Sequence, residues 1–216
     1  MKTFIRHDVP TLKRIDGGEA RLYETPDGSQ YPSVTSVLSL HSGNWLEQWK
    51  KEVGAEFAEA TAARASKRGT AVHQLCEDYL TLGVAKPNLF DLELYKYLLP
   101  YLDKIDNIHA LETPLYSEFL KVAGTVDCIA EYEGKLAIID FKTSSRVKTR
   151  DEIHSYFMQT AAYAVAFEEL TGIPVGHLVI IMAVDHHGVI IFKEKRDDWI
   201  HEFIKLREEY RKCKNI

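Results

Sequence analysis

Cysteine is scarce in this chain, with three residues among 216. Cys76, Cys128 and Cys213 lie far apart, and no two of them form a C-x-x-C pair. A structural zinc site, an iron–sulfur cluster and a disulfide framework all depend on more closely organised cysteines than these. The sequence therefore predicts none of the three, and a reducing compartment is the expected environment.

Long apolar runs and an excess of positive charge are also missing. The longest apolar runs, such as Leu178–Val184, are far too short to cross a bilayer. The first residues include Asp8 and Asp16 and have no apolar core of a signal peptide. We therefore expect no membrane partner and a cytoplasmic location. The net charge of −5 argues against a protein that coats nucleic acid, but not against a nuclease, which needs only a local basic groove.

No repeat, linker or biased segment divides the sequence, so we expect a single domain over residues 1–216. In its N-terminal part, residues 1–110, a short hairpin is expected around Pro26-Asp27-Gly28. Helical composition follows from residue 45 to residue 82, where Gly69 predicts a break between two helices. A third helix is expected over about residues 89–103.

In the C-terminal part, residues 111–216, strand and helix patterns alternate. Two strand patterns, Val122–Tyr132 and Lys135–Lys142, flank Glu133-Gly134, where glycine suits the positive φ of a tight turn. A helix, a second strand pair and a final helix are expected at residues 152–169, 175–184 with 189–193, and 197–214. The order predicts an α/β fold in which helices flank a mixed central sheet, preceded by a helical region.

Counting outward from a turn at Glu133-Gly134 makes Asp127 the cross-strand partner of Asp140. The two carboxylates would share one side of the sheet with Lys142. Opposed like charges are destabilising unless something compensates them, and hard oxygen ligands suit magnesium or manganese. The pattern therefore predicts a metal site at the end of a buried strand pair. A surface ion-pair patch is the alternative.

Further segments occur in a fixed order along the chain. They are Pro32-Ser33-Val34-Thr35, Gly69-Thr70-Ala71-Val72-His73, Gly124-Thr125-Val126-Asp127, Asp140-Phe141-Lys142-Thr143-Ser144 and Gln159-x-x-x-Tyr163. Together they resemble the RecB-like branch of the PD-(D/E)XK nuclease superfamily. Within that branch the likeness is to mitochondrial genome maintenance exonucleases and their phage and bacterial relatives, and it covers about residue 31 to the C-terminus.

This resemblance implies a restriction-endonuclease-like core that binds Mg²⁺ or Mn²⁺. The implied catalytic residues are Asp127, Asp140 and Lys142. The implied metal ligands are His73, Asp127, Asp140 and the backbone carbonyl of Phe141, with Glu118 as an additional ligand. The chain departs from many RecB-like relatives because it lacks the four cysteines of an iron–sulfur cluster, so no such cluster is expected.

The resemblance also implies residues that contact DNA. Gln159 and Tyr163 share one face of a helix. The other expected DNA contacts are Thr143, Ser144, Arg68, Arg146 and Lys148. The basic residues among them flank the motifs, where phosphate contact and an ordinary solvated surface are both reasonable interpretations. Trp45 and Trp49, one helical turn apart, are expected to face the core rather than to stack on bases.

These features predict a metal-dependent exonuclease that hydrolyses phosphodiester bonds of DNA with a free end, with single-stranded DNA as the expected substrate. Other expected partners are proteins of DNA replication, recombination or repair, in the cytoplasm of a bacterium or a phage-infected host cell. Two alternatives stay open. One is a structure- or sequence-specific endonuclease with the same site, and the other is a non-catalytic DNA-end-binding subunit of a recombination complex.

Overall fold

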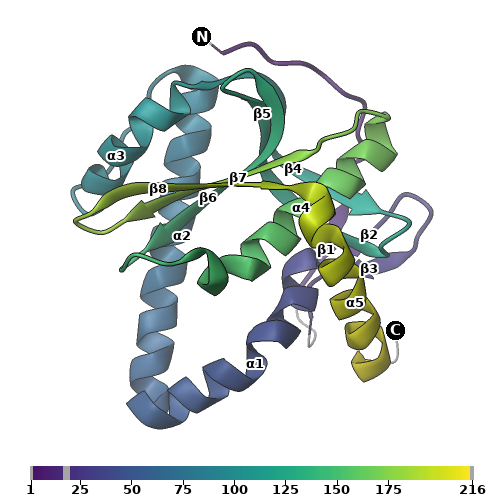
Figure 1. Cartoon of the computed structure of the whole chain (residues 1–216), viewed down its shortest axis with the longest axis horizontal. Helices are drawn as coiled ribbons and strands as arrows, with labels where there is room; N and C mark the ends of the chain where they lie inside the picture. The colour runs from purple at the N-terminus through teal and green to yellow at the C-terminus, as the bar shows by residue number, and fades with distance from the viewer. Residues whose placement is uncertain (1, 17–19, 215–216) are drawn as a thin grey trace.

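The computed structural model describes residues 2–16 and 20–214, without the side chains of residues 42–47. A five-stranded mixed sheet in the order β4-β5-β6-β7-β8 forms its centre (Figure 1). β6 and β7 are parallel, and the other neighbours are antiparallel. The strands are β4 (Ile105–Ser117), β5 (Val122–Tyr132), β6 (Lys135–Ser144), β7 (His177–Val184) and β8 (Gly188–Lys195).

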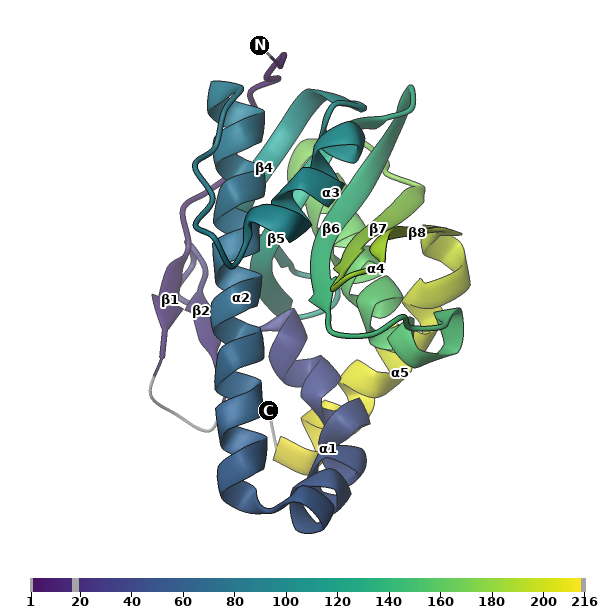
Figure 2. The ribbon, with the colours of Figure 1, turned by 90° about the vertical axis from the view of Figure 1, so that its left-hand side faces the viewer.

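Helices cover both faces of this sheet (Figure 2). After a short 3₁₀ turn, Arg150–Ile153, α4 (His154–Thr171) connects β6 to β7 and packs with α5 (Arg196–Lys214) on one face. α2 (Ala55–Leu82) and α3 (Leu92–Leu102) cover the other face. The predicted α/β architecture is confirmed. Among the described helices, none is long and apolar enough to cross a membrane.

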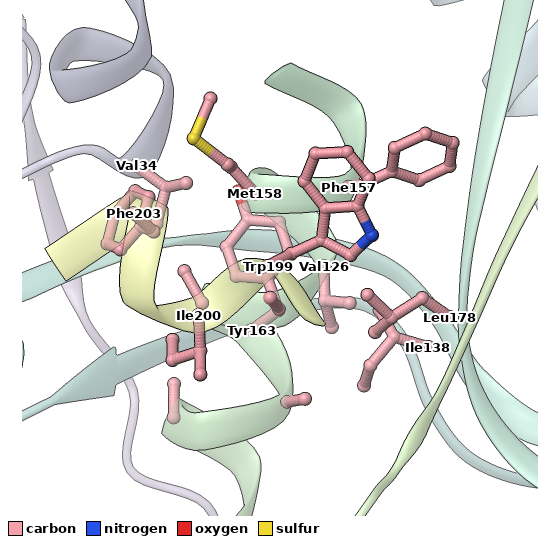
Figure 3. Packing of buried hydrophobic residues seen from close by; sticks show 14 of the residues in the cluster. Val34, Val126, Ile138, Phe157, Met158, Tyr163, Leu178, Trp199, Ile200 and Phe203 are labelled. Atoms are coloured by element: carbon pink, nitrogen blue, oxygen red, sulfur yellow. The ribbon is translucent and has the colours of Figure 1, made fainter. Parts of the chain in front are cut away.

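α4 lies in the middle of the larger core and is buried on nearly all sides. Its small residues, including Ala161 and Ala162, let the helix approach the sheet closely, as expected for a helix that is apolar all round. Phe157 and Tyr163 of α4 lie among side chains of α5 and the sheet (Figure 3). Burial of a side chain the size of Phe157 contributes roughly 1.5–3 kcal/mol, so α4 is held firmly in place.

A second, three-stranded antiparallel sheet precedes the helices. It consists of β1 (Lys13–Ile15), β2 (Leu22–Glu24) and β3 (Gln30–Pro32), which confirms the predicted hairpin and adds a strand to it. A single bridge between Ser33 and Ala123 attaches this small sheet to β5. The N-terminal strands are thereby held beside the central sheet.

The break between the first two helices lies at Gly54, so the expected break at Gly69 is wrong. α1 (Val34–Val53) begins after Ser33, whose hydroxyl accepts a hydrogen bond from the backbone N–H three residues on, at 2.9 Å. Gly54 has φ 88° and ψ 143°, which glycine adopts without strain. Gly69 instead continues α2, because one glycine in a long helix costs only about 1 kcal/mol.

α1 and the first half of α2 project from the sheet and meet at Gly54 (Figures 1 and 2). In α2, Ala58 is the sole buried residue before Val72. Trp49 is half-buried in α1, whereas the expectation for Trp45 concerns a side chain outside the described residues. Where its side chains are described, the projecting pair is therefore mostly exposed.

β4 is a strand that the sequence analysis did not predict, and it crosses the expected boundary between residues 110 and 111. Pro114 lies in the middle of its pairing with β5, which is possible because β4 is an edge strand. The register also shifts between Asp106 and Ala110, and Asn107 has φ 48°. These irregularities remove the regular alternation by which a strand is recognised.

The register of β5 and β6 is the predicted one, out to the pair Cys128 and Ile139. Glu133 and Gly134 both have positive φ, 52° and 77°, as the two central residues of a tight hairpin turn require. Local turn chemistry therefore determines how these two strands align.

Candidate active site

Three elements bring His73, Glu112 and Asp127 together. His73 is on the buried half of α2, Glu112 on β4 and Asp127 on β5. One potential ligand atom from each lies within 4.8 Å of the others. His73 Nδ1 is 3.6 Å from Glu112 Oε1 and 3.6 Å from Asp127 Oδ2. Two carboxylates and an imidazole at this spacing can hold a divalent cation.

Asp127 lies where the ladder between β5 and β6 ends. The last regular pair of β5 is at Cys128, and Asp127 and Asp140 do not form the next one. Instead, Asp127 Oδ2 accepts a hydrogen bond from the backbone N–H of Phe141 at 2.9 Å. Val126 packs in the core beneath α4 and Cys128 in the core beneath α2, so the alternation of β5 is interrupted between them. The predicted opposition of the two aspartates is therefore wrong as a ladder pair.

Glu112 occupies a strained backbone position opposite Asp127. Regular pairs of β4 and β5 flank it at Leu111 and Thr113. The φ of Glu112 is 45°, in the left-handed region, where a residue other than glycine costs about 1–3 kcal/mol. The hydroxyl of Thr113 donates to the carbonyl of Leu111 at 3.0 Å and braces this irregular step. Sequence reasoning missed Glu112 because it missed β4.

The imidazole of His73 connects the acidic cluster to β6. Its Nε2 lies 2.7 Å from the carbonyl oxygen of Phe141, the backbone group that the resemblance implies as a ligand. Burial by itself would lower the pKa of His73, but the carboxylates of Glu112 and Asp127 outweigh burial and raise the pKa to about 9. Without a metal, His73 is therefore protonated at neutral pH. Its Nε2–H then points to the carbonyl of Phe141, and its Nδ1–H faces the carboxylates of Glu112 and Asp127.

Asp140 and Lys142 form a buried ion pair on the α4 side of β6. Lys142 Nζ lies 2.5 Å from Asp140 Oδ2, and Gln159 Nε2 donates to Asp140 Oδ1 at 3.1 Å. Burial raises the pKa of Asp140 to about 6, against the effect of the lysine charge. Burial lowers the pKa of Lys142, but the charges of Asp140 and Asp127 raise it more, so Lys142 is an ammonium ion at neutral pH.

These residues open into a cavity of about 280 Å³. Asp127 and Lys142 of the central sheet and Gln159 of α4 form part of its lining. On the opposite side lie residues of the small sheet and of the start of α1, namely Arg14, Arg21, Tyr23, Ser33 and Thr35. A larger cavity of about 400 Å³, where β6 and β7 begin, contains none of the site residues.

Arg14 and Arg21 give this cavity a cationic wall that sequence reasoning missed. Asp16 lies 2.8 Å from Arg14 Nε and 3.6 Å from Arg21 Nε, and the arginine side chains stay 49% and 42% exposed. Three charges on a small sheet gave no recognisable motif in the sequence. Their position opposite the carboxylates became apparent only from the fold.

Gly124 and Tyr163 are in direct contact beside the cavity. A Cβ added at Gly124 would lie 2.7 Å from the hydroxyl oxygen of Tyr163. The ring of Tyr163 is buried, with an exposure of 3%, and it packs in the core beneath α5 (Figure 3). Burial raises the pKa of its hydroxyl far above the ordinary value. The Gly-Thr-Val-Asp segment therefore has glycine because α4 places a tyrosine against it.

Comparison with known proteins gives a match between residues 86–214 and the PD-(D/E)XK nuclease superfamily, over more than half of the chain. The chain belongs to the PD-(D/E)XK nuclease superfamily. The matched segment contains Glu112, Asp127, Asp140 and Lys142, whereas His73 precedes it. The superfamily supports metal-dependent nuclease chemistry for this site.

Several curated relatives are similar to the chain, and each is named mitochondrial genome maintenance exonuclease 1. The Mus musculus protein is 33% identical over 131 residues, which is 54% of this chain and 38% of the relative. The Homo sapiens protein is 32% identical over 155 residues, or 65% and 44%. The Xenopus tropicalis protein is 34% identical over 146 residues, or 61% and 42%. The matches thus span less than half of these relatives, and no comparison supports the expected bacterial or phage-infected cell.

The donor set of this PD-(D/E)XK chain fits a divalent cation. Asp127 and Glu112 supply hard carboxylate oxygens, and His73 supplies a nitrogen that manganese accepts readily. Their ligand atoms already converge, and the two carboxylates bring negative charge that a cation would neutralise. Asp140 lies beside the cluster but is engaged by Lys142 and Gln159.

Glu118, implied as a ligand by the resemblance, does not join the cluster. Its carboxylate accepts hydrogen bonds from Tyr31 at 2.7 Å and Lys121 at 2.9 Å, at the turn between β4 and β5. The carboxylate that joins Asp127 in the cluster is that of Glu112. Glu112 lies on β4, and Glu118 directly follows that strand. Of these two acids, Glu112 alone has its carboxylate near His73, because its backbone is irregular.

The residues expected to contact DNA have different surroundings. Gln159 and Tyr163 line the cavity, although the buried ring of Tyr163 leaves no face for a base. Thr143 is half-buried, and Ser144 is buried with its hydroxyl donating to the carbonyl of Arg146 at 2.6 Å.

The predicted basic contacts already have protein partners. Arg68 pairs with Asp185, and Arg146 pairs with Glu152. Lys148 donates to the hydroxyl of Tyr156 at 3.0 Å. A DNA phosphate would compete with these carboxylates for the N–H groups of the two arginines.

Proposed function

We propose that this chain is a divalent-metal-dependent exonuclease that hydrolyses phosphodiester bonds of single-stranded DNA from a free end. The observation that carries the proposal is the convergence of His73, Glu112 and Asp127 beside the Asp140–Lys142 pair, in one cavity with a cationic opposite wall. Phosphoryl chemistry needs this combination of a cation site, a fixed positive charge and a place for the phosphates of the strand.

His73, Glu112 and Asp127 are the groups proposed to hold Mg²⁺ or Mn²⁺. The carbonyl of Phe141, which the resemblance implies as a further ligand, lies at Nε2 of His73 and is proposed to fix the imidazole so that Nδ1 faces the ion. When bound, such an ion supplies Lewis-acid stabilisation of the scissile phosphate and makes water more acidic. Asp140, which the resemblance implies as a further ligand, is proposed to complete the coordination from the α4 side once Lys142 turns from it toward the substrate.

Lys142 is proposed to orient the attacking water and to offset negative charge on the phosphate. Because its pKa lies above the ordinary value, it cannot act as the base at neutral pH. Its ammonium group also lies 5.0 Å from the ring centre of Tyr156, which limits the directions in which it can move. Gln159 fixes the carboxylate of Asp140 and thereby positions the lysine.

Arg14 and Arg21 are proposed to bind phosphates of the strand across the cavity from the carboxylates. Arginine forms bidentate contacts with phosphate, and Asp16 holds both guanidinium groups near the opening. The projecting α1 and α2 favour a substrate with a free end, since helices that extend beyond the sheet restrict how a strand reaches the cavity. The relatives' names, which describe exonucleases, support the same choice.

The test is digestion of end-labelled linear single strands, linear duplexes and circular single strands with Mg²⁺, Mn²⁺, Ca²⁺ or EDTA. We expect release of nucleotides from linear single strands with Mg²⁺ or Mn²⁺, and little cleavage with Ca²⁺, whose loose coordination positions groups poorly. Full activity in EDTA would overturn the metal requirement. Equal cleavage of circular and linear strands would favour the endonuclease alternative.

Asp140→Asn is the variant that distinguishes a catalytic protein from a DNA-end-binding subunit. Alanine at this position would leave Lys142 buried without its carboxylate, at a cost of about 3–5 kcal/mol, whereas asparagine keeps an oxygen for it. We expect the rate to fall by about 10²–10³ with DNA affinity retained. The exposed Asp151→Asn is the matched control. Equal rates for the two variants would remove Asp140 from the mechanism.

A further inference from the structure

A second pocket lies at the turn between β4 and β5, against the C-terminal half of α5. Its volume is about 190 Å³, and it is lined by Phe119, Leu120, Lys121, Ile204, Arg207 and Arg211 together with Glu208. α5 runs from the sheet toward the projecting α1, so this pocket lies on the part of the molecule next to the helical pair (Figure 2). None of its residues belongs to the proposed active site.

Arg207 is the unusual residue of this pocket, because it is a buried cation that forms no ion pair with a carboxylate of the described residues. Its residue exposure is 8%. Nε and Nη2 donate to the backbone carbonyl of Lys121, at 3.3 Å and 3.2 Å. Nη1 is buried and has no hydrogen-bond partner among the described residues. Burial lowers the pKa of this guanidinium below its ordinary value. Such a shift means that the neighbouring groups do not offset the cost of burying the charge.

The surroundings of Arg207 attract an anion. Lys121 and Arg211 stand at the same pocket, each beside one carboxylate, Glu118 at 2.9 Å from Lys121 and Glu208 at 3.1 Å from Arg211. Arg207 therefore adds a positive charge that these pairs do not balance. Leaving a buried charge uncompensated is expensive, so an anion that fits the pocket should bind there. Arginine next to a small cavity suits phosphate, with which it forms short, charge-assisted hydrogen bonds.

Phe119 adds an aromatic surface to this cationic pocket. Its side chain is 71% exposed, although an aromatic ring is ordinarily at least half-buried. A ring beside phosphate-binding cations is the arrangement by which proteins bind single-stranded nucleic acid, with bases stacked on aromatics and the backbone on cations. The combination favours a polynucleotide over a free phosphate ion.

We propose that the Arg207 pocket binds a backbone phosphate of the DNA strand, and that Phe119 stacks on an adjacent base, at a subsite remote from the scissile bond. The proposal rests on the proposed function. Lys121 directly precedes β5, and the path along β5 from Val122 to Asp127 measures about 17 Å at about 3.3 Å per residue. Only strands longer than a few nucleotides can therefore occupy both the cavity at Asp127 and this pocket.

The test compares single-stranded oligothymidylates of increasing length, using wild type, Phe119→Ala, Arg211→Ala and Arg207→Ala. Phe119 and Arg211 are exposed, so their variants avoid the loss of folding that Arg207→Ala risks by removing the bonds to Lys121. We expect the ratio of wild-type to variant kcat/KM to rise with length and to reach about tenfold for Phe119→Ala, the effect of one lost stacking contact. For Arg211→Ala on long strands, the slope of log affinity against log salt should shrink by about 0.7.

Matched controls are Lys212→Ala, which removes a positive charge one residue further along α5, and Phe90→Ala, which removes a ring that is 92% exposed elsewhere. Neither should show a length dependence. A ratio that stays constant with length in Phe119→Ala and Arg211→Ala would overturn the proposal. Stabilisation of wild type by inorganic phosphate that is lost in Arg211→Ala, without any length dependence, would reassign the pocket to a free anion and likewise overturn it. Absence of cleavage by wild type at every length would instead refute the proposed function.

Discussion

Replacement of Gly124 by alanine should destabilise the protein by about 1–3 kcal/mol, the usual cost of overpacking a core. The added Cβ would lie 2.7 Å from the hydroxyl oxygen of Tyr163 and 3.0 Å from its Cε1, whereas ordinary contacts begin at 3.4 Å. Tyr163 cannot move aside easily, because its buried ring packs among side chains of α5 and the sheet (Figure 3). The clash should therefore shift α4, and with it Gln159, away from the site.

The source of this destabilisation can be tested with Tyr163→Phe, which removes the closest atom and leaves the ring. In the double variant Gly124→Ala/Tyr163→Phe, the loss of unfolding free energy should be smaller than the sum of the single losses. We expect a coupling of about 1 kcal/mol, within the range for residues in contact. Gly176→Ala is the matched control, since a Cβ there meets nothing within 4 Å.

Urea unfolding followed by tryptophan fluorescence measures these free energies, and single-turnover cleavage measures the effect on the site. Gly176→Ala should be neutral or stabilise by up to about 1 kcal/mol through the unfolded chain. If Gly124→Ala is as stable as Gly176→Ala, the contact with Tyr163 is not as close as the structure has it. If the losses simply add, the clash involves some other group.

Three further predictions concern the acidic cluster and α2. Glu112→Gln should weaken Mn²⁺ binding by at least about tenfold in calorimetric titrations, because loss of a direct metal ligand costs no less than loss of a group that supports a ligand. Glu118→Gln should leave Mn²⁺ binding unchanged. Equal effects of the two variants would remove Glu112 from the site. Because metal binding must displace the proton that His73 retains up to a pKa of about 9, Mn²⁺ affinity should rise about tenfold per pH unit near neutrality and level off above about pH 9, with about one proton released. An affinity that is independent of pH would contradict this assignment. Gly69→Ala should raise the unfolding free energy by up to about 1 kcal/mol in urea unfolding, because the residue lies inside α2 with open space around its Cα; a loss of stability would show that Gly69 has a role beyond the helix.

Local chemistry explains which parts of the fold could be predicted from the sequence. The turn at Glu133-Gly134 requires positive φ at both residues, so it determines the register of β5 and β6 without reference to the rest of the chain. The helices and the second hairpin likewise follow from periodicity and turn residues. The placement of Asp127 on β5 and of Asp140 and Lys142 on β6 follows from the same local patterns.

The missing parts depend on contacts between distant segments. β4 contains Pro114 and an irregular step, and it is a strand only because β5 offers it an edge. Gly54 and Gly69 look equally capable of ending a helix, and the sequence alone does not say that packing around Val72 continues α2 through Gly69. Arg14 reaches the cavity through the fold of a separate small sheet. No local sequence pattern predicts that residues of the small sheet and of the central sheet line one cavity.

The site lies where regular strand pairing fails, and the irregularity itself assembles the charges. Beyond Cys128, the backbone N–H of Phe141 loses a ladder partner, and the carboxylate of Asp127 takes that place at 2.9 Å. On the other side of β5, the left-handed backbone of Glu112 turns its carboxylate toward His73. Asp127 thus has a structural task as well as the chemical one proposed for it. A buried N–H without an acceptor costs about 1–3 kcal/mol, so loss of the Asp127 carboxylate should loosen the end of the β5–β6 ladder together with the cation site.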